Sequence, residues 1–150
     1  MMNNIFNTTF EISLRVLLNL FVSRNSEKTL DNIAACDFIT TYSRNFSIAF
    51  TNLHGYSEFS FNEFATRRAL ASEALKSLVL DNLVSISARS DGFYYTINKR
   101  GIELCNKMNT EYAKSYIELC QITNKFLRDK DEIEILDLIK KEEIKELQRR

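Results

Sequence analysis

The stretch from Phe10 to Ser23 constrains the fold most strongly, because it is apolar on nearly every side. Its apolar positions are Ile12, Leu14, Val16, Leu17, Leu18, Leu20, Phe21 and Val22. A helix with apolar side chains all round is a buried helix, so other elements must enclose it. We therefore expect a central core helix over residues 10–23. Thr8 or Thr9 can cap it, because a hydroxyl there can accept a free backbone N–H of the first turn.

Two further helices are predicted before an alternating segment. Residues 29–42 carry apolar side chains at helical spacing, and residues 61–81 do the same after Ser60 and Glu63, which together are typical of a capping box. The connection over residues 43–60 is long for a loop without secondary structure of its own, so we expect this loop to be packed against the domain or to have a function.

A β-hairpin is predicted next. Residues 83–87 and 93–97 have the composition and alternation of strands, and Ser90-Asp91-Gly92 between them is a turn sequence. Asn98 can cap a fourth helix with Gly101 in its first turn, and residues 109–150 are helical with a break at residues 129–131.

The order of these elements predicts a mainly α fold with a small β-hairpin. Three helices followed by a two-stranded wing favour a winged helix-turn-helix domain over residues 1–108. Residues 109–150 would be a helical C-terminal extension packed on that domain or on a partner.

Residues that usually carry chemistry are few and scattered. His54 has no nucleophile and no set of metal ligands at a recognisable spacing, so we expect a loop side chain hydrogen-bonded to backbone. The three cysteines lie far apart in the sequence and are expected to be buried and reduced: Cys36, Cys105 and Cys120. The three glycines are too widely spaced for a phosphate-binding loop. We expect that the chain is not an enzyme and that it has no catalytic residue, cofactor, metal site or small-molecule substrate.

Charge and hydropathy limit the cellular locations and the classes of binding partner that we expect for the chain. The 20 basic residues are balanced by 20 acidic residues, which argues against a strong non-specific nucleic-acid binder because phosphate neutralisation needs a basic field. The N-terminus lacks the pattern of a signal peptide, and the longest apolar stretch is too short to span a bilayer. We expect a cytoplasmic protein without membrane contact.

The outer face of the third helix is a candidate protein-binding surface. A face that reads bases needs Arg, Lys, Asn or Gln, whereas this one carries Ala69, Leu70 and Leu80 together with a glutamate. An exposed apolar face favours contact with a protein. Arg67 and Arg68 flank the buried stripe of the same helix and are candidates for structural ion pairs, with Asp37 or Glu63 as the acidic partner.

Two other groups of residues are candidates for contact. Arg89, Lys99 and Arg100, in and after the wing, are the best candidates for touching a DNA backbone, although isolated surface basic residues are common. The last helix has a narrow apolar stripe among dense alternating charge, as in coiled-coil or groove-binding helices, and Ile144 and Leu147 are its candidate partner-binding residues.

Five segments together resemble one protein family over nearly the whole chain. They are TLDNIAACDFITTYSRNF, NLHG, EFATRRALASEALKSLVLDNLVSI, GFYYTINKRGIELC and YAKSY. The sequence resembles the middle components of bacterial ABC-three-component systems, also called Lamassu-type antiphage defence. The most specific groups are Asp37-Phe38-Ile39, residues 52–55 and Arg67-Arg68, because no folding rule requires them together.

The resemblance implies a non-catalytic accessory subunit that works beside two larger proteins. One would be an SMC-like ATPase with long coiled coils, to which this chain docks, and the other an effector, often a nuclease, which it helps to restrain. DNA contact would be secondary. The alternative from a different class is a winged-helix transcription regulator that dimerises through its C-terminal helices and binds DNA.

Overall fold

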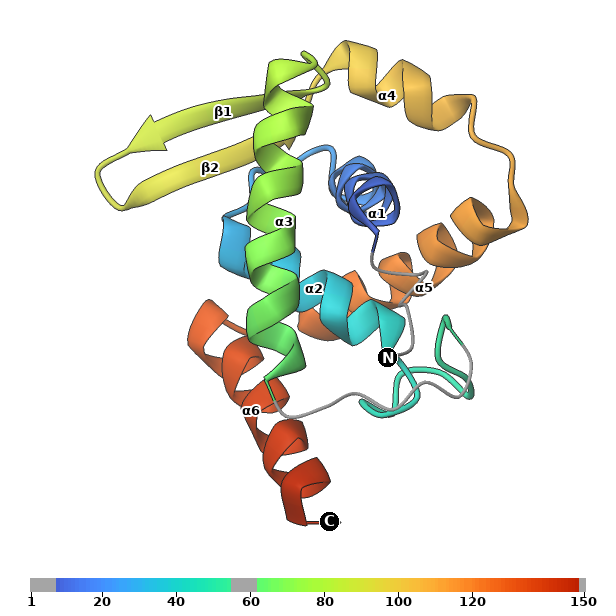
Figure 1. Ribbon diagram of the computed structural model, residues 1–150, viewed down its shortest axis with the longest axis vertical. Helices are drawn as coiled ribbons and strands as arrows, with labels where there is room; N and C mark the ends of the chain where they lie inside the picture. Colours follow the sequence, from blue (N-terminus) through green and yellow to red (C-terminus); the bar gives the residue numbers. More distant parts are fainter. Residues whose placement is uncertain (1–7, 55–61, 149–150) are drawn as a thin grey trace.

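The structure is a computed structural model, which describes residues 8–54 and 62–148. Within these residues the chain is mainly helical, with six helices and one two-stranded antiparallel sheet (Figure 1). The elements in chain order are α1 (Thr9–Val22), α2 (Leu30–Thr41), α3 (Glu63–Leu80), β1 (Val84–Arg89), β2 (Gly92–Ile97), α4 (Lys99–Asn106), α5 (Glu111–Leu127) and α6 (Glu132–Gln148). The prediction of a mainly α chain with one small β-hairpin is confirmed.

Side-chain caps set the start of several helices. The side-chain oxygens of Thr8, Thr29 and Asn98 each accept a hydrogen bond from the backbone N–H three residues later, at 3.2, 3.1 and 2.9 Å. Each of these bonds satisfies one of the N–H groups that the first turn of a helix leaves without an intrahelical partner. The caps predicted at Thr8 and Asn98 are therefore confirmed.

The start of α3 differs from the prediction. Ser60, the predicted cap, lies outside the described residues, and the helix begins at Glu63 rather than at residue 61. Asn62 precedes it in the left-handed conformation, with φ of 78°, and makes no side-chain cap hydrogen bond. The Glu63 carboxylate accepts hydrogen bonds from the Tyr42 hydroxyl at the end of α2 and from Arg67. This carboxylate helps to join α3 to α2.

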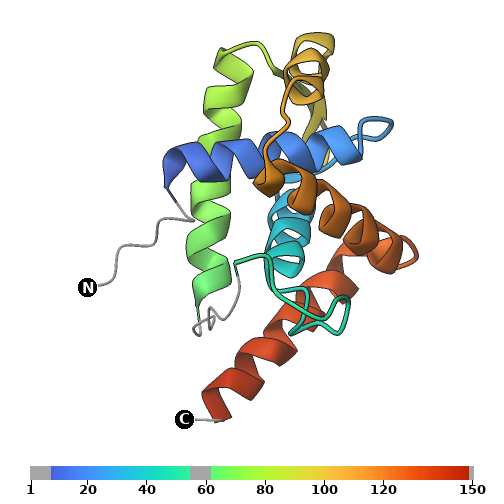
Figure 2. The same cartoon turned by 90° about the vertical axis from the view of Figure 1, so that its right-hand side faces the viewer.

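The helices α1 and α2 form the centre of the molecule. α1 packs against α2, α3, α4 and α5, and Figure 2 shows it crossing α3. Nine consecutive residues of α2, from Ile33 to Thr41, are buried. The predicted burial of the first helix is confirmed, and α2 is buried even more completely because α1, α3, α5 and α6 all pack on it.

The two strands form a wing that projects from one side of the molecule (Figure 1). Val84 pairs with Ile97 at the base, where both are buried, and Arg89 pairs with Gly92 at the exposed tip. Both strands continue further toward the turn than the sequence predicts. The backbone of Lys28 exchanges two hydrogen bonds with that of Tyr95, at 3.0 and 2.8 Å, which ties the loop before α2 to the wing.

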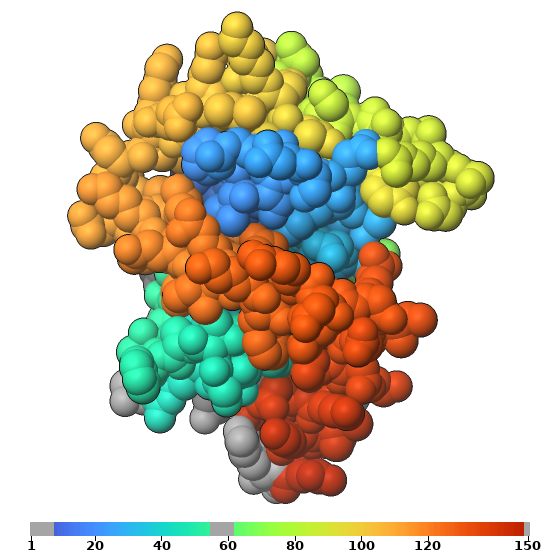
Figure 3. Space-filling view, turned by 180° about the vertical axis from the view of Figure 1, so that it is seen from behind, coloured from blue at the N-terminus to red at the C-terminus, as the bar shows by residue number. Residues whose placement is uncertain are grey.

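The last two helices cover the core, with α5 on the side opposite α3 (Figure 2). The buried residues of α5 are Ala113, Tyr116, Cys120, Thr123 and Leu127. α6 packs on α2 through its buried Ile135 and Ile139 (Figure 1). The space-filling view from behind shows α5 running between α1 and the loop that follows α2 (Figure 3). No helix in residues 8–54 and 62–148 is long and apolar enough to cross a membrane.

Candidate functional site

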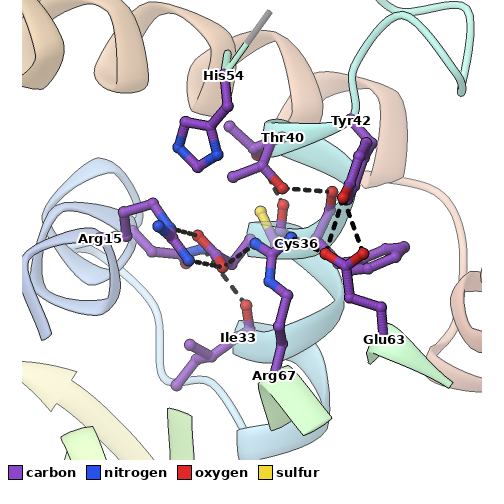
Figure 4. A network of polar contacts seen from close by, with 12 residues as sticks. Arg15, Ile33, Cys36, Thr40, Tyr42, His54, Glu63 and Arg67 are labelled. Atoms are coloured by element: carbon purple, nitrogen blue, oxygen red, sulfur yellow. Dashed lines mark hydrogen bonds and ion pairs between the residues drawn. The ribbon is translucent and has the colours of Figure 1, made fainter. Parts of the chain in front are cut away.

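A dense cluster of polar side chains lies in the core, where α1, α2, α3 and α5 meet (Figure 4). Asp37, on α2, is its centre. The Asp37 carboxylate accepts hydrogen bonds from Arg15 Nε of α1 at 3.0 Å, from Arg67 Nη2 of α3 at 2.7 Å and from Tyr116 Oη of α5 at 2.8 Å. One buried carboxylate therefore joins four helices.

The charges in this cluster compensate one another. The side chains of Arg15, Arg67 and Asp37 are only 1%, 6% and 10% exposed. Burial alone would raise the pKa of the Asp37 carboxyl, but the charges of the two arginines outweigh it and hold that pKa well below its usual range. Glu63, whose carboxylate lies 3.4 Å from Arg67 Nη1, supplies a second negative charge. Two guanidinium groups thus face two carboxylates.

Aromatic rings enclose the α3 side of the cluster. The Arg67 guanidinium lies 5.1 Å from the centroid of the Phe38 ring and 5.8 Å from that of Tyr42. The Tyr42 hydroxyl donates to Glu63 at 2.8 Å, and burial together with the Glu63 charge raises the pKa of Tyr42. Arg67, a predicted ion-pair residue, therefore lies between the carboxylates of Asp37 and Glu63 and against two rings.

Arg68 lies apart from this cluster. It pairs with Asp31 near the first turn of α2, and both side chains are partly exposed. The two predicted ion-pair arginines of α3 therefore have different surroundings although they are neighbours in sequence, because adjacent helix positions point about 100° apart.

A second set of hydrogen bonds extends the cluster toward the wing. Asn19 Nδ2 donates to the Tyr116 hydroxyl at 3.4 Å. Lys28 Nζ donates to Asn19 Oδ1 at 3.4 Å and to Asn124 Oδ1 at 3.1 Å. Asn19 is fully buried and Lys28 is 9% exposed. The network members Arg15, Asn19 and Tyr116 were not among the predicted site residues, although a charged and an amide residue inside an otherwise apolar helix signal buried partners.

His54 lies at the edge of the network (Figure 4). A hydrogen bond to backbone was predicted for this side chain, whereas the partner that the structure shows at Nε2 is the Tyr112 hydroxyl, at 2.8 Å. The two rings stack with their centroids 5.8 Å apart. Burial and the nearby charges of Arg15 and Arg67 lower the pKa of His54 to about 3, so the ring is neutral at pH 7.

The three cysteines differ in their surroundings, and a hydrogen bond with Cys120 lowers the pKa of the Cys36 thiol to about 6. All three are buried, and none of them forms a disulfide bond in the structure. A hydrogen bond with Cys36 and burial raise the pKa of the Cys120 thiol, and burial raises the pKa of Cys105 to about 12. In the part of the chain that the structure describes, no three His, Cys, Asp or Glu side chains are grouped so that they could hold a metal ion.

The outer face of α3 is mostly small and weakly charged. Ala69 is exposed, and Leu80, at the end of the helix, is 85% exposed. Leu70 is not on the exposed face as predicted: it is half-buried and packs against the core, because it lies next to the buried Arg67 and Ala74, three positions before and four positions after it, at the edge of the inward face. Leu80 borders an open depression between the end of α3 and α4, with a volume of about 690 Å³, whose lining includes Leu83, Leu104, Arg100 and Lys107.

The three candidate DNA-contact residues do not form one basic stripe. Arg89 pairs with Glu27, and its guanidinium lies 4.4 Å from the centroid of the Tyr94 ring. Arg100 Nη1 donates to the carbonyl oxygen of Asp81 at 2.9 Å, at the C-terminal end of α3. Lys99 is exposed. Two of the three cations are therefore already engaged within the chain.

The candidate partner-binding residues of the last helix are exposed. Ile144 and Leu147 are 42% and 53% exposed on α6. α6 and the Leu80 end of α3 lie at opposite ends of the molecule (Figure 1). The structure therefore does not bring the predicted partner-binding residues together, but divides them between two separate surfaces.

Comparison with known proteins gives one family match. The model of the family described as MC2, the ABC-three component (ABC-3C) system Middle Component 2, matches residues 5–149. The match includes all the helices and strands described above. No curated protein and no solved structure is significantly similar to the chain.

Proposed function

The chain belongs to the family of middle components of ABC-three-component systems, and from this membership we propose that it is a non-catalytic accessory subunit of an antiphage defence complex. A middle component of a multi-subunit system has protein partners in the same system. We propose that these are an SMC-like coiled-coil ATPase and an effector, as in systems of the Lamassu type. The chain would bind the ATPase and help to keep the effector inactive.

We further propose that residues 1–108 form a winged-helix unit with residues 109–150 as its helical extension. The order of three helices, a two-stranded antiparallel wing and a short fourth helix supports this assignment. In winged-helix proteins the third helix commonly presents its outer face to the ligand. Here the exposed residues of α3 include Ala69 and Leu80, and its exposed Lys76 is paired with Glu73. A face without exposed Arg, Asn or Gln favours a protein partner over base edges.

The observation that carries the proposal is the distribution of charged and apolar groups. Arg15, Asp37 and Arg67 are used inside the core, where protein atoms engage them. In contrast, Leu80 and Leu104, which are 85% and 40% exposed, border the same depression at the end of α3. An exposed apolar group of this kind at the rim of a depression is typical of a protein-binding site.

Co-expression of the tagged chain with the products of its flanking genes tests the proposal. We expect the chain to elute with a coiled-coil ATPase in size-exclusion chromatography. Leu80→Asp should abolish this co-elution without unfolding the chain, as checked by circular dichroism. Phe50→Asp is a matched control, since Phe50 is 96% exposed in the loop after α2 and far from this surface. Unchanged assembly with Leu80→Asp, or equal loss with both variants, would contradict the proposed surface.

DNA binding by a dimeric regulator is the alternative function. It predicts sequence-dependent binding of a labelled duplex at low ionic strength, weakened by Arg89→Ala or Arg100→Ala and by added salt. The pairing of Arg89 with Glu27 weighs against this alternative, because a phosphate would have to compete with an existing carboxylate. Elution of the chain without an ATPase, together with such duplex binding, would favour the regulator.

A further inference from the structure

The helix α6 has a second apolar stripe on the side that faces away from the molecule. Its inward residues, Ile135 and Ile139, are buried against the core. We define the outer stripe of α6 by five residues at successive spacings of three, four, four and three: Ile133, Leu136, Lys140, Ile144 and Leu147. These spacings place the five on one face over about 21 Å, at about 1.5 Å of rise per residue.

Most of the outer stripe is open to solvent in this structure, whereas Leu136 is half-buried and packs against the core. Ile133, Ile144 and Leu147 are 79%, 42% and 53% exposed. Figure 2 shows the C-terminal half of α6 extending away from the other helices. Three large aliphatic side chains in line on the most highly charged helix of the chain are more than scattered surface residues, and they fit the seam of a coiled coil.

The two halves of α6 differ in charge. The first half carries three acidic residues and no basic residue, whereas the second half carries three lysines and three glutamates. Two of these lysines already have partners within the helix, since Lys141 pairs with Asp137 and Lys145 with Glu142. A second copy that runs in the opposite direction suits this arrangement better than a parallel one, because the acidic half of each copy then faces the half that contains the lysines. A parallel pair would set like charges opposite each other, which is destabilising.

We propose that two copies of this chain associate through the outer stripe of α6 as an antiparallel, two-fold symmetric pair. In one register, Ile133 of each copy faces Ile144 of the other, and Asp137 faces Lys140. Each of these contacts occurs twice, as a two-fold interface requires. The outer stripe contains one charged residue, Lys140, and this register places an acidic partner opposite it. This pairing is independent of the accessory role proposed above.

The oligomeric state of the full-length chain, measured by sedimentation equilibrium over a wide concentration range, tests the proposal. We expect reversible association from the 17.5 kDa monomer to twice that mass. Ile144→Asp should remove the dimer. Leu80→Asp is the control, because Leu80 is 85% exposed at the opposite end of the molecule and should leave the dimer intact. This contrast separates failure of the dimer from failure of the ATPase-binding surface.

Exchange of the paired charges tests the antiparallel register. Asp137→Lys alone or Lys140→Asp alone places like charges opposite each other twice, and each should weaken dimerisation by about tenfold. The double variant restores both pairs, so we expect dimerisation close to that of the wild type. Circular dichroism of each variant checks that α6 remains helical.

Three outcomes would overturn the proposal. A wild-type chain that stays monomeric at every concentration excludes self-association. A double variant that is no better than the single variants excludes the register. If the chain is a monomer and Ile144→Asp instead abolishes binding to the ATPase, the outer stripe belongs to the partner subunit and not to a second copy.

Discussion

Replacement of Asp37 by asparagine removes one charge from the centre of the buried network with almost no change of shape. In the wild type its carboxylate accepts hydrogen bonds from Arg15, Arg67 and Tyr116 at 3.0, 2.7 and 2.8 Å. The amide leaves two guanidinium groups, 1% and 6% exposed, without their main counter-charge. Breaking a buried ion pair by removing one partner costs about 3–5 kcal/mol. We expect Asp37→Asn to lower the free energy of unfolding by that amount.

Asp31→Asn is the matched control for this prediction. Asp31 also joins α2 to α3, through Arg68, but these two side chains are 32% and 44% exposed. Exposed pairs contribute about 0–1 kcal/mol, so Asp31→Asn should have little effect. Urea denaturation followed by circular dichroism measures both variants, and their m-values should match that of the wild type. A difference of less than about 1 kcal/mol between the two variants would refute the assigned role of burial.

Comparison of Asp37→Asn with the wild type also gives a pH test. The pKa of Asp37 is lower in the folded chain than the ordinary value of about 3.9 expected when it is unfolded. Its stabilising contribution is therefore fully present above about pH 4 and is lost as the pH falls toward the depressed folded-state pKa. The wild type should lose stability more steeply than Asp37→Asn below about pH 4. Parallel curves for the two proteins in this range would contradict the assignment.

Two further substitutions have outcomes that follow from the structure. The folded-state pKa of His54 is about 3, so the unfolded chain binds a proton first, and the wild type should lose roughly 1–2 kcal/mol between pH 6.5 and pH 5. His54→Gln should remove this pH dependence, as measured by urea denaturation at the two pH values. If the free energy of unfolding of the variant falls with pH as steeply as that of the wild type, His54 is not its source. A Cβ at Gly101 would lie 2.4 Å from the Leu83 carbonyl oxygen and 2.7 Å from Ile97 Cγ1. Gly101→Ala should therefore cost about 1–3 kcal/mol in the same assay, and a neutral result would show that α4 can move away from the hairpin.

Local sequence signals predict most of the secondary structure. The all-round apolar pattern at residues 10–23 predicts α1, and the turn at residues 90–92 places the hairpin. Both depend on short-range physics: helical periodicity, capping and turn conformation. The start of α3 is less predictable, because Glu63 is engaged by Tyr42, a residue 21 positions away.

The buried network could not be assembled from the sequence, because its members come from four helices. Arg15 and Asn19 interrupt an apolar helix and signal buried polar partners, but nothing local identifies Tyr116, which is 79 residues from Asp37. The prediction that Arg67 pairs with Asp37 or Glu63 needed only the helix faces, and the structure shows both pairs. The half-burial of Leu70 depends on how closely α3 packs against its neighbours, which periodicity leaves undetermined.

Three of the twenty cationic residues are arginines that hold helices together within the chain. Arg15 and Arg67 are buried with Asp37, and Arg68 pairs with Asp31. Cations held in this way cannot neutralise phosphate without losing contacts that support the fold. At the end of α3 and along α6 the chain exposes large aliphatic side chains, and along α6 these lie beside exposed lysines. Such surfaces select protein partners, because burial of aliphatic groups contributes to affinity only when the partner removes them from water.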